Sequence, residues 1–453
     1  MRRSDEILLP QGVHPTNRQV TEIGRHRLLL EWIFGDFEEA EERVGEERAQ
    51  GAPAWLQGVQ GLWGPRLLLA LGGLLVLAAA LVYPVVQQRL EEERAARRRA
   101  IAEIVRLEGW AWMNSDWESL PKLLDPQARP EWLTWYRRFY EGLRYWAGDA
   151  ARRPVAEVQE VELLRSDLAR VRVHILQAEV PDGVTWQETR FYRWVDGRWR
   201  RTSPPLEQWG EPRVLETDRF RFEYQALDAA WVRGAGSGLD KAERHLRERL
   251  ALPPAPADAP RLVVQIRPDN VGVDPDRFVG RRMVIPSPLL ARTPVGYTPQ
   301  ETLLATVLPG LADRLLAQAL GRAVPDQNWH FIQVGLKRWL AADAAALLIP
   351  EPVHVWPALE RYVQANGFPP LQSLRLGHYP QWFWSSEWLP QAGESVVAYG
   401  LETYGVERLP ALLDGLIRYR SWDALVPGVF GVSAEEFQAG WREWTLERLG
   451  RDE

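Results

Sequence analysis

The chain has 453 residues, of which 46% are hydrophobic and 26% charged, and its formal net charge is −6. This length suits about three domains of roughly 150 residues each. The acidic balance, without a basic face or tail, argues against nucleic acid as the main partner. Because the chain contains no cysteine, it forms no disulfide, no thiolate metal site and no cysteine nucleophile.

Residues 1–65 are expected to form a polar N-terminal tail. They hold little core material, and the acidic stretch Asp36–Gln50 is typical of a solvated run or an exposed helix. The tail has neither a zinc-ligand spacing nor a helix-turn-helix signature. It therefore indicates no function of its own.

A single transmembrane helix is predicted at residues 66–87. Leu67–Val86 is a run of 20 residues without a charge, and at about 1.5 Å per residue a helix of this length spans a hydrocarbon core of about 30 Å. Trp55 and Trp63 before the run and Tyr83 near its end suit an aromatic belt. The alternative is a buried helix of a soluble core, in which so long an uncharged run is uncommon.

Residues 88–210 are expected to form a small α+β domain. Apolar residues at helical spacing follow the span as far as Asp125-Pro126, and residues 130–146 have the pattern of a second amphipathic helix. The period then changes to two, which predicts strands. In one of them Val171, Val173 and Ile175 alternate with Arg170, Arg172 and His174. The dipeptide Asp196-Gly197 predicts a tight hairpin turn.

This order, which closes on the stretch FYRWVDGRWRRTSP (Phe191–Pro204), resembles the cone-shaped nuclear-transport-factor-two-like fold over about residues 97–205. Proteins with this fold include pocket enzymes as well as non-catalytic adaptors, so the fold alone does not decide the function. A pocket enzyme would need a buried acid–base pair on the inner face of the sheet. His174, the one histidine of this region, is expected to face solvent. The prediction is therefore a non-catalytic cone.

Residues 211–453 are expected to form a mainly helical α+β domain. Strands are predicted near residues 219–224, 261–268 and 281–288, with a helix from about Asp228 to Leu252 and further helices after the last strand. One of these helices, Glu301–Arg322, has Pro309 and Gly310 side by side at its centre, where a helix tolerates them least.

This succession resembles the gluzincin metallopeptidases of the peptidase MA group over about residues 220–449. In such enzymes one helix bears H-E-x-x-H, which supplies two zinc ligands and the general base, and the next helix supplies a third ligand. The resemblance places Pro309 and Asp313 at the histidine positions, Gly310 at the base and Val334 at the third ligand. It implies a degenerate zincin-like domain without metal or cofactor.

Three further stretches carry this resemblance: GLKRWL (335–340), AYGLETYG (398–405) and FGVSAEEFQAGWREW (430–444). An unrelated helical domain is the alternative. In that case GLKRWL is plain amphipathic packing, with Leu336 and Trp339 inward and Lys337 and Arg338 outward.

Taken together, the resemblances imply a membrane-anchored pseudo-peptidase that binds or senses a protein or carbohydrate ligand without chemistry. The bacterial cytoplasmic membrane is the expected location, with the C-terminal domains outside the cytoplasm. The aromatic stretch His378–Pro390 is a candidate ligand platform, although a loop packed on the core would have the same composition. The platform residues are His378, Tyr379, Trp382 and Trp384.

Two other functions and the opposite orientation stay open. The chain would be an enzyme if Asp313 with Glu301, or His378 with Tyr379, formed a non-zinc site. It would be a structural bitopic protein if its tail recruited a cytoplasmic partner. The positive-inside rule places the C-terminal part in the cytoplasm. The arginines near the span are Arg48 and Arg66 before it, and Arg89, Arg94, Arg97, Arg98, Arg99 and Arg106 after it.

Overall fold

The computed structural model describes residues 64–114, 116–137, 154–177, 185–269, 278–321, 325–352, 356–375 and 388–450. The chain divides into two compact units between Glu93 and Arg94. Helix α2 (Gly64–Met113) is the first described element, and it continues without interruption through Pro84 and the charged stretch after the predicted span.

Two described helices are long and apolar enough to cross a membrane, judged by length and composition alone. One is α2, whose large apolar side chains between Leu74 and Val86 are exposed. The other is α5 (Pro299–Leu320), which is half buried in the core of the C-terminal domain. Because core helices of soluble proteins pass the same test, the single membrane span remains a prediction.

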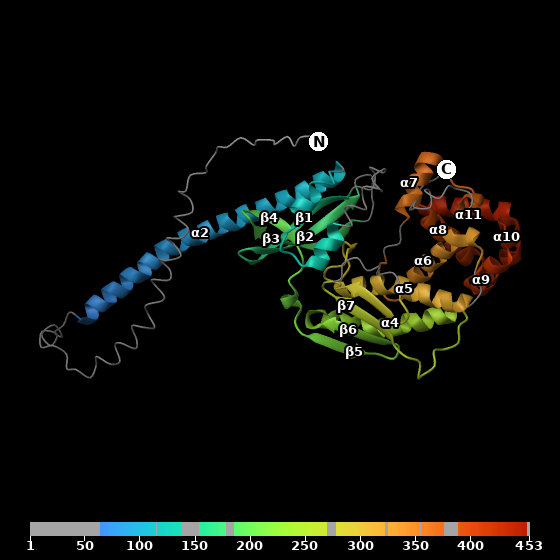
Figure 1. Ribbon diagram of the computed structural model, residues 1–453, viewed down its shortest axis with the longest axis horizontal. Helices are drawn as coiled ribbons and strands as arrows, with labels where there is room; N and C mark the ends of the chain where they lie inside the picture. Colours follow the sequence, from blue (N-terminus) through green and yellow to red (C-terminus); the bar gives the residue numbers. More distant parts are fainter. Residues whose placement is uncertain are drawn as a thin grey trace, which may run out of the picture. The chain divides into compact units, whose positions relative to one another are not determined.

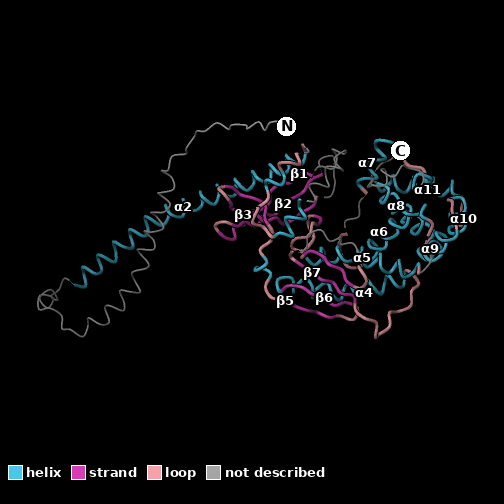
Figure 2. The backbone as a smooth tube through the Cα atoms, viewed as in Figure 1, coloured by secondary structure: helices cyan, strands magenta, loops and turns pink. Residues whose placement is uncertain are grey.

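The first sheet is antiparallel and follows the chain order β1-β2-β3-β4; Figure 2 shows its strands β1, β2 and β3 in magenta. Its strands are β1 (Pro154–Arg165), β2 (Leu168–Gln177), β3 (Trp186–Val195) and β4 (Arg198–Thr202). Between β3 and β4, Asp196 and Gly197 have φ angles of 50° and 76°. Both angles are positive, as the predicted type I′ hairpin requires, so the turn is confirmed.

The inner face of this sheet packs against the C-terminal part of α2. Ile101 and Val105 on the helix share one core with Val171, Val173 and Ile175 on β2, as the alternating pattern predicted. His174 points to the opposite face with Arg170 and Arg172, and it is half-buried there. A mixed helix-and-sheet domain is therefore present where it was expected.

The second sheet follows the order β5-β6-β7-β8. Its strands are β5 (Pro212–Glu216), β6 (Phe220–Gln225), β7 (Leu262–Arg267) and β8 (Arg282–Pro286). Strand β5 is antiparallel to β6, whereas β6, β7 and β8 are parallel. Strand β8, which ends at Pro286, lies at an edge of the sheet, where a proline is tolerated.

One face of the second sheet is covered by helices, and Figure 1 shows α4 and α5 beside β6 and β7. The helices after β8 form the rest of the domain, and α8 contacts α6, α7 and α11. Their bounds are α4 (Ala229–Arg249), α6 (His330–Ala346), α7 (Pro357–Asn366), α8 (Trp388–Tyr404), α9 (Leu409–Arg418), α10 (Trp422–Phe430) and α11 (Ala434–Arg448).

Helix α5 runs unbroken through Pro309 and Gly310. A capping box holds its start: the Thr298 hydroxyl accepts from the Glu301 backbone N–H at 3.2 Å, and the Glu301 carboxylate accepts from the Thr298 N–H at 2.7 Å. Glu301 is twelve residues from Asp313, or about 18 Å along the axis. Asp313 lines the cleft described below, whereas Glu301 is not among the residues that line it.

The expected boundary at residues 210 and 211 separates two sheets with separate cores. Two contacts nevertheless join them within the unit that begins at Arg94. The short strand β9 (Thr293–Pro294) pairs with β3 at Trp186 and Gln187. The Trp209 indole donates to the Ser287 hydroxyl at 3.1 Å.

Candidate binding cleft

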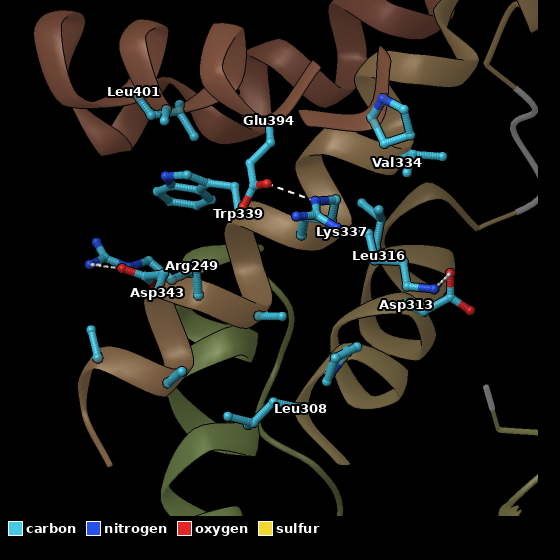
Figure 3. Close-up of a pocket in the computed structure, with 18 of the residues that line it drawn as sticks. Arg249, Leu308, Asp313, Leu316, Val334, Lys337, Trp339, Asp343, Glu394 and Leu401 are labelled. Atoms are coloured by element: carbon cyan, nitrogen blue, oxygen red, sulfur yellow. Dashed lines mark hydrogen bonds and ion pairs between the residues drawn. The ribbon is translucent and has the colours of Figure 1, made fainter. Parts of the chain in front are cut away.

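A cleft of about 1260 Å³ lies among α5, α6 and α8 in the C-terminal domain (Figure 3). Three of the four positions that the metallopeptidase resemblance singled out line it: Pro309, Asp313 and Val334. Pro309 and Asp313 share one face of α5 because they are four residues apart. Gly310, next to Pro309, is buried.

Where the resemblance places metal ligands, the structure has an ion pair. The Lys337 ammonium lies 3.8 Å from Asp313 Oδ1, and Figure 3 shows the two side chains facing each other across the cleft. Lys337 follows Val334 by three residues on α6, so both belong to the same helix face. Both side chains are partly exposed, at 25% for Lys337 and 42% for Asp313. The pair therefore contributes at most about 1 kcal/mol to stability.

The other carboxylates that line the cleft are also paired with cations. The Glu394 carboxylate, buried on α8, accepts from Arg338 Nε at 2.7 Å. Asp343 accepts from Arg249 Nε at 3.1 Å. His245 Nε2 lies 2.5 Å from the same Asp343 oxygen. Glu402 is 2.7 Å from Arg448.

Most of the remaining wall of the cleft is apolar, although Tyr297, His330 and Gln333 also line it. Its large aliphatic side chains are Leu308, Leu316, Leu320, Ile349, Leu401 and Val406. Leu336 and Trp339 of the GLKRWL stretch are buried, as the amphipathic pattern predicted, and Trp339 also lines the cleft. Lys337 and Arg338, expected to face solvent, are partly exposed and line the cleft. The cleft thus combines an apolar wall with internally neutralised charges.

The residues at the degenerate motif do not make a zinc site. A catalytic zinc needs three protein ligands with an open position for water, and Pro309 and Val334 carry no donor atoms in their side chains. Nowhere in the described residues do three or more histidine, cysteine, aspartate or glutamate side chains form a group that could hold a metal ion. The predicted ligand platform, His378, Tyr379, Trp382 and Trp384, lies outside the described residues.

The structure also has a buried charged cluster that the sequence analysis missed, on the inner face of the first sheet. Its members are Glu108, Glu188, Arg190 and Arg201. Burial on its own would raise the pKa of Glu188, but Arg190 and Arg201 outweigh burial and hold it below the ordinary value. The sequence signal was the alternation in β3. Its inward-facing residues are Trp186, Glu188, Arg190 and Tyr192. The first sheet therefore carries buried acidic and basic side chains on its inner face, which the sequence analysis had sought only in His174.

Comparison with known proteins gives no match to this chain, whether among family models, curated proteins or solved structures. The interpretation of the cleft therefore rests on the chain's own residues.

Proposed function

We propose that the protein is a membrane-anchored, non-catalytic pseudo-peptidase whose C-terminal domain binds a peptide segment of a partner protein. In this proposal α2 passes once through a bacterial cytoplasmic membrane, residues 88–210 form a cone-like domain, and residues 211–453 form a degenerate zincin-like domain. Both soluble domains lie outside the cytoplasm.

The observation that carries the proposal is the convergence of Pro309, Asp313 and Val334 on one cleft. The metallopeptidase resemblance selected these positions from the sequence alone. Two of them lie on α5 and the third lies on α6. In an unrelated helical domain, nothing would require all three positions to line the same cleft. The meeting of the three positions in one cleft supports a zincin-like arrangement of the helices. Because a proline and a valine stand where metal ligands would be, the residue types support the loss of zinc binding and catalysis.

The cleft has the composition of a binding groove for an extended, mostly apolar peptide. Small-ligand and peptide grooves are lined mainly by apolar side chains with a few placed polar groups. Here each lining carboxylate among the described residues has a cationic partner, which leaves little net charge to attract an ion. Apolar burial would supply most of the affinity, and the polar pairs would orient the peptide backbone.

A zinc-restoration variant tests the zincin-like arrangement. Pro309→His, Gly310→Glu, Asp313→His and Val334→Glu would rebuild the motif, and Lys337→Met would remove the ammonium beside it. We expect the combined variant to bind zinc in a spectrophotometric competition assay. The matched control keeps Val334 and therefore lacks the third ligand; it should bind zinc less tightly. Failure of the combined variant to bind zinc while still folded would contradict the zincin-like arrangement.

A second experiment tests the binding function. A phage-displayed library of linear peptides is selected against the full chain in lipid nanodiscs. Ala342→Arg places a long charged side chain in the cleft wall, and we expect it to abolish binding of the selected peptides. Leu347→Arg, just after the same helix at an exposed position outside the cleft, is the control and should bind normally. Equal binding by both variants would exclude the cleft as the peptide site.

A zinc assay on the natural chain tests the non-catalytic part of the proposal. Stoichiometric zinc, removed by a chelator with loss of a proteolytic activity, would refute it.

A further inference from the structure

A second cavity, of about 200 Å³, lies in the cone-like domain. Helix α2 contributes Glu108, Gly109 and Trp112, and the first sheet contributes the other members of the buried charged cluster, Glu188, Arg190 and Arg201. Aromatic side chains form another part of the wall: Trp112, Trp135 and Tyr136. At about 30 Å³ for each water, the volume equals that of roughly seven waters, which is more than a single structural water needs.

The charged groups around this cavity are held in fixed positions. Arg190 Nη1 donates to Glu108 Oε2 at 3.0 Å, and the Tyr192 hydroxyl donates to the same oxygen at 3.2 Å. Arg190 also donates to Glu188. Arg201 Nη2 donates to the Tyr136 hydroxyl at 2.9 Å. Charge-assisted bonds of this kind fix both partners, so the cavity is lined by preorganised groups.

One atom in this arrangement is left without a donor. Glu108 is only 5% exposed, and no group among the described residues donates a hydrogen bond to its Oε1 atom. A buried carboxylate oxygen without a donor is costly, because it has lost water and gained nothing in return. Since Glu108 lines the cavity, a molecule inside the cavity is the natural source of the missing donor.

The surrounding groups restrict the chemistry of that molecule. The lining holds two carboxylates, Glu108 and Glu188, and three guanidinium groups, so a cation meets the arginines, an anion meets the carboxylates, and neither finds a wall of one opposite charge. A hydroxyl group both donates and accepts, so it serves the carboxylate and an arginine N–H at once. The aromatic wall offers ring faces on which the C–H edges of a small saturated ring can pack. A cluster of waters would make few hydrogen bonds to that wall.

We propose that this cavity binds a small neutral molecule rich in hydroxyl groups, of the size of a monosaccharide or cyclic polyol, with Glu108 Oε1 accepting one of its hydroxyls. The site is shared by two parts of the chain. Arg292, which immediately precedes β9, lines the cavity and lies with its guanidinium 5.6 Å from the Trp186 ring. The neighbouring Thr293 hydroxyl accepts from Thr302 on α5 at 3.0 Å, so the site contacts the helix that lines the cleft.

Gly109 provides a variant that fills the cavity without disturbing the fold. A Cβ atom built on Gly109 meets nothing closer than the Ala156 nitrogen at 3.9 Å, which is an ordinary contact. Gly109→Leu should therefore fold and occupy the cavity. Gly109→Ala is its control, because it adds one methyl group at a helical position and leaves most of the volume open.

A second pair of variants tests the carboxylate. Glu108→Gln keeps the side-chain shape but turns an amide N–H toward the cavity in place of the acceptor. Glu160→Gln removes a carboxylate from β1 whose partner is the exposed Arg172, and it is the control. We expect Glu108→Gln to weaken ligand binding about tenfold or more, since the lost bond is charge-assisted. Glu160→Gln should leave binding unchanged.

Binding is measured by saturation-transfer NMR on the full chain in lipid nanodiscs, because glycoside detergents would compete. The neutral probes are glucose, N-acetylglucosamine, myo-inositol and glycerol, and the charged probes are glucosamine and glucuronate. We expect at least one neutral probe to bind with a Kd below about 10 mM, and Gly109→Leu to lose this binding while Gly109→Ala keeps it. Binding of no neutral probe to the natural chain, which would mean a cavity filled by water only, would overturn the proposal. Stronger binding of a charged probe, or undiminished binding by Gly109→Leu, would overturn it equally.

Discussion

Asp228 is a buried carboxyl group with one satisfied oxygen. It is fully buried at the junction of β6 and α4, and its Oδ1 accepts from the Ser287 hydroxyl at 2.7 Å. No described group donates to Oδ2. Burial raises the pKa of Asp228 from the ordinary 3.8 to about 6, against the lowering effect of Ser287. The folded state therefore favours the protonated form.

This raised pKa makes stability depend on pH in a definite direction. Below about pH 4 the group is protonated whether the chain is folded or unfolded, and its contribution to folding is fully present. As the pH rises through about 6, an ionised carboxylate must be buried, and about 3 kcal/mol of that contribution is lost. We expect Asp228→Asn to flatten this part of the thermal-stability profile between pH 4 and pH 7. The exposed Asp218→Asn is the control, and an unchanged profile for Asp228→Asn would contradict the assignment.

The hairpin turn offers a second test at the level of single residues. Asp196 has a φ of 50°, a conformation that aspartate tolerates and β-branched residues resist. We expect Asp196→Val to lower the free energy of unfolding by about 1 kcal/mol. Asp196→Asn should have little effect, since asparagine accepts the same conformation. Chemical denaturation of both variants would distinguish strain in the backbone from loss of the charge.

At this scale the sequence predicted backbone positions better than the partners of side chains. The alternation in β2 and the dipeptide at the turn are local signals, and both were confirmed. The orphan oxygen of Glu108 could not be predicted, because its neighbours come from β3, more than 80 residues further along the chain. Spacing along a helix shows which face a residue occupies, but not which distant charges meet that face.

Among the helices, α6 and α8 cross at a contact between glycines. A Cβ atom on Gly335 would lie 2.2 Å from the Gly393 carbonyl carbon, and one on Gly393 would lie 2.1 Å from the Phe331 oxygen. At these distances the added Cβ atom would overlap a backbone atom. Because backbone atoms cannot rotate away as a side chain can, the helices themselves would have to move. Gly335, the glycine of GLKRWL, is therefore required by the close packing of α6 against α8, whether or not the domain is zincin-like.

We expect Gly335→Ala to lower the free energy of unfolding by about 3 kcal/mol or more, because the two helices must separate. The gain in helix propensity, about 1 kcal/mol, is too small to compensate. The control is Gly238→Ala on α4, where the nearest atom is a leucine methyl at an ordinary 3.5 Å. That variant should be neutral or slightly stabilising. A stable Gly335→Ala chain by thermal unfolding would show that the helices do not cross this closely.

The elements with a strong period were predicted from the sequence, and the weakest was missed. Helix α4 begins and ends within about three residues of the expected positions. Strand β5 was not predicted, because it is exposed along most of its length and lacks an alternating pattern. Likewise β9 has two residues, too few for any periodic signal. The cleft positions were predicted only through the resemblance, since no local rule links Val334 to α5.

For the molecule as a whole, the proposed attachment to the membrane depends on α2. Its large apolar side chains from Leu74 to Val86 are exposed, which would be unfavourable in water over so long a run. We expect the full chain to stay in the membrane pellet after extraction with sodium carbonate or high salt, and to be released by detergent. A control with Leu75→Arg and Leu77→Arg should move into the soluble fraction, because charged residues at the centre of a span are costly. Release of the natural chain without detergent would contradict the span.

The orientation of the chain is the point at which two physical arguments disagree. Six arginines follow the span closely and two precede it, which favours a cytoplasmic C-terminal part. That rule weakens for long translocated domains, and 360 residues follow Glu93. Moreover, the arginines from Arg94 onward belong to the part of α2 that continues into the compact unit of the soluble domains. The presence of these arginines is thus explained by the exposed surface of the helix as well as by a cytoplasmic location.

We therefore expect the soluble domains outside the cytoplasm, and the lack of cysteine allows a direct test. Glu435→Cys introduces one thiol at an exposed position of α11, and Glu46→Cys introduces one before the span. A membrane-impermeant maleimide added to intact spheroplasts should label Glu435→Cys at once. It should label Glu46→Cys only after the membrane is permeabilised. The opposite pattern would place both soluble domains in the cytoplasm, and the peptide in the cleft would then have to come from a cytoplasmic partner.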